Sequence, residues 1–171
     1  FYGTQTLRAL LPIAAHRTPA GELVAECFMD AVRIADAPRV RYRGLLLDVA
    51  RNFRSPQTVK KLLDLMAFYK LNRLHWHLTD DEGWRIEIQA LPELTEVGGR
   101  RGHTLDDVEH LMPSHGSGPF ATPAGEGGSG FYTQDEVIEI LRYAAARQIT
   151  VIPEIDLPGH ARAAIKAMEA R

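Results

Sequence analysis

Residues 73–78 read Arg-Leu-His-Trp-His-Leu, in which polar and apolar residues alternate with a period of two. Successive side chains of a β-strand point to opposite faces, so this alternation predicts a strand with His75 and His77 on one face. The other face carries the apolar side chains of Leu74, Trp76 and Leu78. The polar segment 79–83 follows directly, and we therefore expect its acidic residues at the carboxyl end of the strand.

A helix and another strand are predicted before this segment. Ser55-Pro56 combines a capping hydroxyl with a proline suited to the first helical position. Apolar residues then recur at helical spacing, and Asn72 is the expected end of the helix. The apolar face consists of Val59, Leu62, Leu63, Met66 and Ala67. Upstream, Gly44-Leu-Leu-Leu-Asp-Val49 is a short apolar run typical of a buried strand.

A long loop, a helix, a strand and a final helix are predicted downstream. Residues 98–130 are rich in Gly, Pro, Ser and His without periodicity, which indicates a long functional or mobile loop. Thr133-x-x-Glu136 is a capping box that opens a helix. Ile149–Ile152 is a short strand, and residues 161–171 form a helix without a stop signal, so we expect a fragment.

Strands that alternate with helices, and that are nearly continuously apolar, predict an α/β fold with a parallel sheet. The predicted units are too few to close a (β/α)8 barrel, which takes about 250 residues. The pattern therefore leaves two alternatives, a partial TIM barrel or the edge of a doubly wound sheet.

The first part of the chain is expected to belong to a separate small domain. Residues 4–11 have leucines at helical spacing, and Pro12 marks the end of that helix. Residues 24–34 are interpreted as a strand. A connector near Arg39 is the expected domain boundary and divides the chain into residues 1–38 and 39–171.

The composition excludes several classes of protein. Twenty Lys and Arg residues stand against 22 Asp and Glu residues, a net charge of -2 that does not suggest a nucleic-acid-binding surface. No apolar run approaches the roughly 18 residues that a membrane helix needs. Cys27 is the single cysteine, so a disulfide-stapled scaffold and multi-cysteine zinc sites are excluded.

Polar residues recur where the three predicted parallel strands end. The carboxyl end of such a sheet is where ligands bind in barrels and in open α/β sheets. The clusters are Asp48 with Arg51, Asp80 with Asp81, and Glu154 with Asp156 and His160. Glu154 and Asp156 are two residues apart, so they would share one face at about 6.6 Å, near the separations used by carboxylate pairs in glycoside hydrolysis.

Other residues in and near the predicted strands suggest alternative functions. His75 and His77 could bind one metal ion together with Asp80 or Asp156, as in a metal-dependent hydrolase that activates a water molecule. Trp84 could stack on a sugar ring or simply fill the core. A third alternative is a carbohydrate-binding module, in which Trp84, Arg51 and the acidic residues hold a glycan without catalysis.

Three motifs run from Arg43 to Arg51, from Lys70 to Arg85 and from Pro153 to His160. They resemble, in the same order, motifs of glycoside hydrolase family 20, the β-N-acetylhexosaminidases. Phe1–Leu7 is similar to the end of the small α/β domain that precedes the catalytic barrel of the family. The resemblance implies a TIM barrel, of which this chain holds roughly the first three strands.

The resemblance also implies an activity: removal of terminal N-acetylglucosamine or N-acetylgalactosamine from glycans or chitooligosaccharides. In such enzymes the acetamido oxygen of the substrate attacks the anomeric carbon, and the configuration is retained. No cofactor and no metal are implied. An extracytoplasmic location, whether secreted, periplasmic or lysosomal, is favoured, and the oligomeric state stays open.

The roles of individual residues follow from the same resemblance. Arg51 matches the arginine that grips the outer hydroxyls of the sugar, and Trp84 is assigned to substrate binding with it. Asp80 and His160 match the pair that supports the catalytic glutamate, with Asp156 holding the imidazole. The family motif His-x-Gly-Gly-Asp-Glu does not occur in this sequence. We therefore place the acid/base glutamate and the orienting aspartate beyond Arg171 and expect residues 1–171 alone to be inactive and poorly stable.

Overall fold

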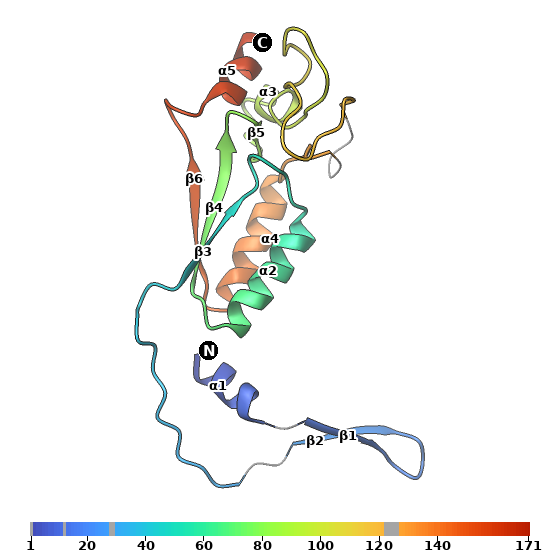
Figure 1. Ribbon diagram of the computed structural model, residues 1–171, viewed down its shortest axis with the longest axis vertical. Coiled ribbons are helices and arrows are strands. Elements are labelled where there is room, and N and C mark those ends of the chain that lie inside the picture. Colours follow the sequence, from blue (N-terminus) through green and yellow to red (C-terminus); the bar gives the residue numbers. More distant parts are fainter. Residues whose placement is uncertain (1, 12, 28–29, 122–126) are drawn as a thin grey trace. The chain divides into compact units, whose positions relative to one another are not determined.

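The protein is described here from a computed structural model, which divides into two compact units, Phe1–Tyr42 and Arg43–Arg171 (Figure 1). Each unit is considered by itself. The residues that the structure describes are 2–11, 13–27, 30–121 and 127–171. Within these ranges, no helix has the length and apolar character needed to cross a membrane. The assignment of residues 1–38 to a small α/β domain stays a prediction.

The first unit contains helix α1 (Tyr2–Leu10) and an antiparallel hairpin of strands β1 (Ile13–Arg17) and β2 (Leu23–Cys27). The predicted helix is confirmed, although Pro12 lies outside the described residues. The strand predicted over residues 24–34 is wrong for residues 30–34, which are not in a strand. The partner of β2 is β1, which the sequence did not indicate, and their pairing runs from Arg17 opposite Leu23 to Ile13 opposite Cys27.

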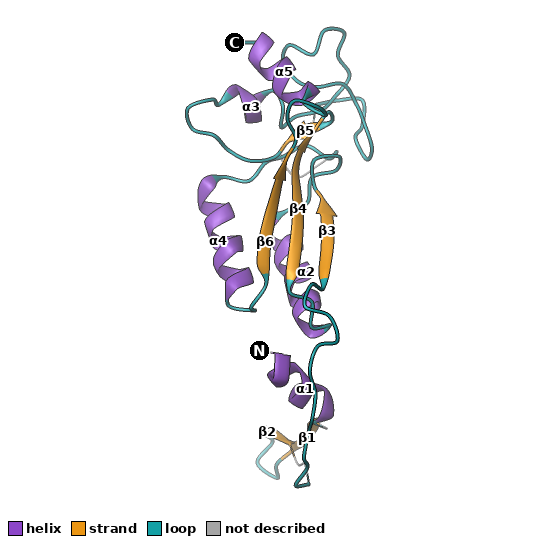
Figure 2. Ribbon diagram, turned by 90° about the vertical axis from the view of Figure 1, so that its left-hand side faces the viewer, coloured by secondary structure: helices purple, strands orange, loops and turns teal. Residues whose placement is uncertain are grey.

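The second unit is built on a parallel sheet, as predicted. Strand β4 (Arg73–Asp80) lies in the middle, with β3 (Gly44–Asp48) on one side and β6 (Thr150–Ile155) on the other, both parallel to it (Figure 2). A short strand, β5 (Gly83–Trp84), turns back antiparallel to the end of β4. The α/β class is confirmed, and β4 and β6 extend further toward the acidic residues than the sequence predicted.

The helices begin where the capping signals place them. Ser55 caps α2 (Pro56–Phe68), and both bonds of the Thr133–Glu136 capping box are present at α4 (Gln134–Ala145). The α2 helix ends at Phe68 and not at Asn72, because Lys70 adopts a left-handed backbone conformation with φ 60°. Asn72 instead accepts a hydrogen bond from the Arg43 backbone N–H just before β3.

Two further helices complete the second unit. The α3 helix (Glu93–Glu96) is short and was not predicted, whereas α5 (Arg162–Glu169) falls within the predicted final helix. Residues 98–130 contain no long helix or strand where they are described, which confirms the predicted loop. Figure 1 shows α2 and α4 side by side on one face of the sheet, while α3, α5 and the long loop lie at the carboxyl end of β4.

The core lies between the sheet and the α2–α4 layer. Leu74, Trp76 and Leu78 point into it from β4, as the alternation predicted. The Trp76 ring packs edge-on against Tyr132, with ring centroids 4.7 Å apart. Burial raises the pKa of Tyr132 above its usual range, and its hydroxyl donates a hydrogen bond to the Arg54 carbonyl. A second cluster forms around α3 and α5 from Trp84, Leu94, Val97, Leu111, Ala163 and Ala167.

Arg85 joins the loops at the carboxyl end of the sheet. Its side chain is fully buried, and burial lowers its pKa to about 9. The guanidinium donates hydrogen bonds to backbone carbonyls of Val49, Ala50, Glu82, Gly99 and Gly130. These carbonyls come from the loop after β3, the turn after β4 and both ends of the long loop. One buried cation therefore holds three separate segments together.

Substitution of Arg85 tests this arrangement. We expect Arg85→Met to lower the free energy of unfolding by about 3–5 kcal/mol, because buried carbonyls lose their donors. Urea unfolding followed by circular dichroism measures the change. Arg100→Met, at an exposed arginine in the same region, serves as the control and should change stability by less than about 0.5 kcal/mol. Equal unfolding midpoints for the two variants would contradict this role.

Candidate active site

The three polar clusters predicted at the strand ends meet at one edge of the sheet, where β3, β4 and β6 run in the same direction (Figure 2). Asp48 is the last residue of β3, Asp80 is the last residue of β4, and Asp156 directly follows β6. Arg51 connects the first two strands by pairing with both Asp48 and Asp80. Because all three strands are parallel, their carboxyl ends meet and bring these side chains together.

Arg51 is held by three carboxylates. Its Nη1 lies 2.8 Å from Asp48 Oδ2, its Nη2 lies 2.6 Å from Asp80 Oδ2, and its Nε lies 3.6 Å from Glu82 Oε2. Its backbone N–H also donates to Asp48 Oδ1 at 3.0 Å. The hydrogen bond with Asp48 raises the pKa of Arg51. The guanidinium has five N–H donors and its side chain is 37% exposed, so it can also donate to a ligand.

The Asp48 carboxyl is tuned by opposing effects. Burial acts to raise its pKa, but the backbone and side-chain hydrogen bonds from Arg51 act to lower it. The nearby charges of His77 and Arg51 lower it further. The net result is a pKa of Asp48 below its usual value, so this carboxylate is ionised at neutral pH.

Asp80 is the most buried acid of the site, with 1% of its side chain exposed. Besides Arg51, it has His77 Nε2 at 3.2 Å and His160 Nδ1 at 3.3 Å as neighbours. The Asp81 backbone N–H donates to Asp80 Oδ1 at 2.6 Å. The predicted pair of Asp80 and His160 is therefore in contact, and the same carboxylate also reaches Arg51.

His160 presents its ring from the turn between β6 and α5. Its backbone has a φ of 53°, a left-handed conformation that costs energy for a residue with a side chain. Its Nδ1 lies 3.3 Å from Asp80 Oδ1 and 3.7 Å from Asp81 Oδ2, while the side chain is 61% exposed. When Nδ1 donates its proton to Asp80, the other ring nitrogen of a neutral imidazole is an acceptor.

The sequence analysis predicted that Asp156 holds the imidazole of His160, and the structure shows that this prediction is wrong. Among the described residues its carboxylate contacts His77 instead, with Oδ2 3.6 Å from Nε2. Its backbone N–H donates to Thr79 Oγ1 at 2.9 Å. The reason is the register of the parallel pair, which aligns His77 with Glu154 and Thr79 with Ile155. Asp156 therefore lies beside β4, four residues before His160.

Trp84 fills the second core and is not placed to bind substrate. It is 6% exposed and packs within the cluster around α3 and α5. Its indole N–H donates to the Ile86 carbonyl at 2.6 Å. A ring buried to this extent has no open face on which a sugar could stack. The structure thus favours the core alternative and corrects the substrate-binding assignment.

The predicted metal ligands are brought together only in part, because His77 lies with Asp80 and Asp156 but without His75. His75 Nε2 lies 2.7 Å from Glu154 Oε2, whereas the groups with metal-compatible spacing are His77 with Asp80 and Asp156, and Asp80 with Asp81 and His160. His77 Nε2 lies 2.8 Å from the Thr79 carbonyl, which can only accept, so this nitrogen carries the proton. A protonated ring nitrogen cannot ligate a metal, and Asp80 is already paired with Arg51. The donor set therefore fits a metal poorly.

Two residues near the site were not predicted from the sequence. Glu82 contacts Arg51, and its position after Asp80 and Asp81 was the available signal. Arg101, from the long loop, donates from Nη1 to the Arg51 carbonyl at 2.6 Å. Nothing in the local pattern around Arg101 indicated this contact, because the two residues lie 50 positions apart.

Comparison with known proteins places these features in a family. The family model described as glycosyl hydrolase family 20, catalytic domain, matches residues 40–171. A β-hexosaminidase of Vibrio vulnificus is 47% identical over 171 residues, covering 100% of this chain and 18% of that protein. An N,N'-diacetylchitobiase of Vibrio harveyi is 56% identical over 138 residues, covering 81% of this chain and 15% of that protein.

Solved structures agree with these relatives. A GH20 exo-β-N-acetylglucosaminidase from Vibrio harveyi, in complex with N-acetylglucosamine, is 45% identical with a TM-score of 0.74. The match covers 98% of this chain and 24% of that one. The N-acetyl-β-hexosaminidase of Streptomyces plicatus is 40% identical with a TM-score of 0.66, covering 95% of this chain and 28% of that one.

The chain spans less than a third of each of these relatives. The family model nevertheless covers more than half of the chain, and its match contains all of the strand ends that form the site. On this evidence the chain belongs to glycosyl hydrolase family 20.

Proposed function

We propose that this chain is part of a β-N-acetylhexosaminidase, a glycoside hydrolase that removes terminal, non-reducing N-acetylglucosamine or N-acetylgalactosamine from glycans or chitooligosaccharides. The observation that carries the proposal is the Asp80 carboxylate, which bridges Arg51 and His160. The names of the relatives, β-hexosaminidase and chitobiase, support it.

We also propose an extracytoplasmic location, because glycans and chitooligosaccharides are met outside the cytoplasm. Cell fractionation of the native organism tests this location.

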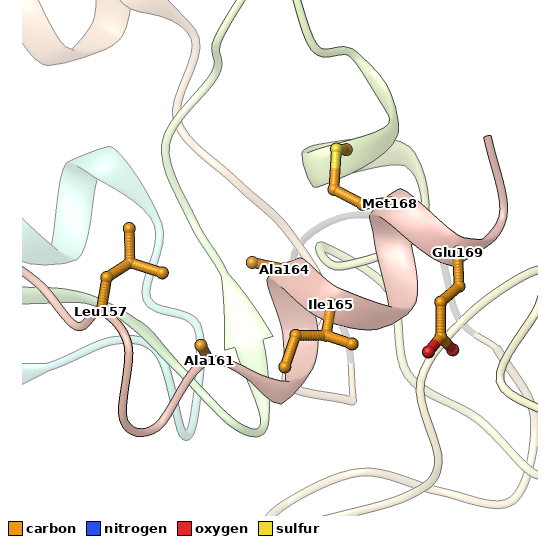
Figure 3. A pocket seen from close by; sticks show the side chains of 6 residues that line it. All are labelled: Leu157, Ala161, Ala164, Ile165, Met168 and Glu169. Carbon is orange, nitrogen blue, oxygen red and sulfur yellow. The ribbon is translucent and has the colours of Figure 1, made fainter.

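We also propose that residues 39–171 are the N-terminal part of a TIM barrel. The parallel strands β3, β4 and β6 are neighbours in chain order, and α2 and α4 cover the same face (Figure 1). A doubly wound sheet would carry helices on both faces. A groove on α5, lined by Leu157, Ala161, Ala164, Ile165, Met168 and Glu169, is apolar and open (Figure 3). A further barrel unit would cover it.

The proposed mechanism is substrate-assisted and retaining. The acetamido oxygen of the substrate attacks the anomeric carbon, so the protein supplies no nucleophile of its own. Arg51 would donate to outer hydroxyls of the sugar, a role suited to a rigid and permanently charged fork. Asp80 would fix the His160 ring through Nδ1, leaving the other nitrogen to bind the carboxyl of an acid/base glutamate beyond Arg171.

Comparison of two proteins tests the activity: residues 1–171, and a longer protein extended through the missing strands. We expect only the longer protein to hydrolyse 4-nitrophenyl N-acetyl-β-glucosaminide, because the family motif His-x-Gly-Gly-Asp-Glu does not occur in residues 1–171. EDTA should leave the rate unchanged, since the donor set fits a metal poorly. Loss of activity with EDTA would favour the metal-dependent hydrolase. Sugar binding without hydrolysis in the longer protein would favour the carbohydrate-binding module.

Substitution of Arg51 tests its role in binding the sugar. We expect Arg51→Met in the extended protein to lower kcat/KM by about 10- to 100-fold, because a charged hydrogen bond contributes about 1.5–3 kcal/mol. Steady-state kinetics with the same glycoside measures the loss. Arg100→Met removes an exposed arginine outside the site and should leave kcat/KM within about twofold. An Arg51 variant with unchanged kcat/KM would rule out this contact.

A further inference from the structure

Arg101 occupies an unusual place for an arginine of a long loop. Its side chain is fully buried, and its guanidinium makes hydrogen bonds to backbone carbonyls only. Nη1 donates to the Arg51 carbonyl at 2.6 Å, while Nη2 donates to the His115 carbonyl at 2.8 Å and to the Gly127 carbonyl at 3.4 Å. Arg101 therefore connects two turns of the long loop to the residue that grips Asp80.

The loop is shaped to hold this guanidinium. Gly128 has a φ of 74°, and a Cβ at this position would lie 1.6 Å from Arg101 Nη2. Gly116 has a φ of 76°, and a Cβ there would lie 2.8 Å from the side-chain nitrogen Nδ2 of Asn52, the residue after Arg51. Both glycines thus allow the loop backbone to approach where a larger residue would collide. The Arg101 backbone N–H is fixed as well, by Ser129 Oγ at 3.0 Å.

Burial of the Arg101 charge costs free energy, and the groups around the guanidinium offset this cost only in part. Burial lowers the pKa of Arg101, whereas the charge of Glu82 acts in the opposite direction. Its Nε is buried without a hydrogen-bond partner among the described residues. An arginine that only filled space could be replaced by an apolar side chain at less cost. What distinguishes Arg101 is the group that it contacts, the main chain of Arg51.

We infer that Arg101 is a positioning residue for Arg51. Asp48 holds the Arg51 backbone N–H and Arg101 holds its carbonyl, so both peptide groups of this residue are fixed. The Arg51 fork is thereby directed toward Asp80 and Glu82. The same guanidinium also binds carbonyls of the long loop, so this loop helps to support the proposed sugar site. This inference rests on the proposed function for its kinetic consequence, but not for its geometry.

A double-mutant cycle in the extended enzyme tests the kinetic consequence. We expect Arg101→Met to lower kcat/KM by about 10- to 100-fold, the scale of losses caused by a small displacement of a binding group. In an Arg51→Met background the same change should cost less than about twofold, because Arg101 acts through Arg51. If the loss of kcat/KM in the double variant equalled the product of the losses in the two single variants, the proposal would be overturned. Arg100→Met is the matched control and should have no effect in either background.

A spectroscopic measurement tests the geometry without activity. The Nε–H resonance of Arg51 in a ¹H–¹⁵N spectrum of the full chain is assigned by its loss in Arg51→Met. We expect Arg101→Met to shift or broaden this resonance and Arg100→Met to leave it unchanged. An unmoved resonance in folded Arg101→Met would overturn the proposal. A moved resonance in a protein without hexosaminidase activity would retain the positioning role and reject the proposed function.

Arg101→Lys keeps the experiment decisive if the methionine variant does not fold. Lysine retains the charge but lacks the planar fork, so it cannot donate to the Arg51 and His115 carbonyls with the same geometry. We expect the lysine variant to fold with a lowered midpoint of thermal unfolding, together with an intermediate shift of the Arg51 resonance and an intermediate kcat/KM. A folded lysine variant with an unmoved resonance and an unmodified kcat/KM would reject the role.

Discussion

The ion pair between Arg51 and Asp80 is the interaction on which the arrangement of this site depends. Asp80 is nearly inaccessible to water, and a buried carboxylate is tolerated only where cations and hydrogen-bond donors surround it. Its neighbours Arg51, His77 and His160 come from the loop after β3, from β4 and from the turn before α5. Satisfying one carboxylate therefore requires all three parallel strands to be in register.

Around this pair, several carboxylates and three guanidinium groups lie close together. Asp48, Asp80 and Glu82 supply three carboxylates, and the three nearby arginines supply the opposite charges. Arg51 is partly exposed and contacts the acids directly. Arg85 and Arg101 are fully buried and bind backbone carbonyls, while the charge of Glu82 acts on both. Arg51 keeps 37% of its side chain exposed, while the two buried arginines hold the surrounding loops.

The site also shows how far sequence reasoning extends and where it stops. Asp48, Asp80 and Asp156 were placed correctly at the carboxyl ends of the strands, because each directly ends or follows a strand that can be recognised locally. Asp156 was assigned the wrong neighbour, because a parallel register, and not spacing along the chain, sets its contact with His77. Trp84 was assigned to the substrate, whereas packing around α3 and α5 buries it.

The sequence by itself determined the parallel α/β unit, its helix starts and the edge at which the polar residues gather. Those features depend on periodicity and capping, which act between residues a few positions apart. Only the tertiary structure decided which polar groups contact one another, including the contact between Arg101 and Arg51 across 50 positions. The physical reason is that such partners are chosen by the packing of distant segments and by the need to satisfy every buried charge and carbonyl, neither of which has a local signature.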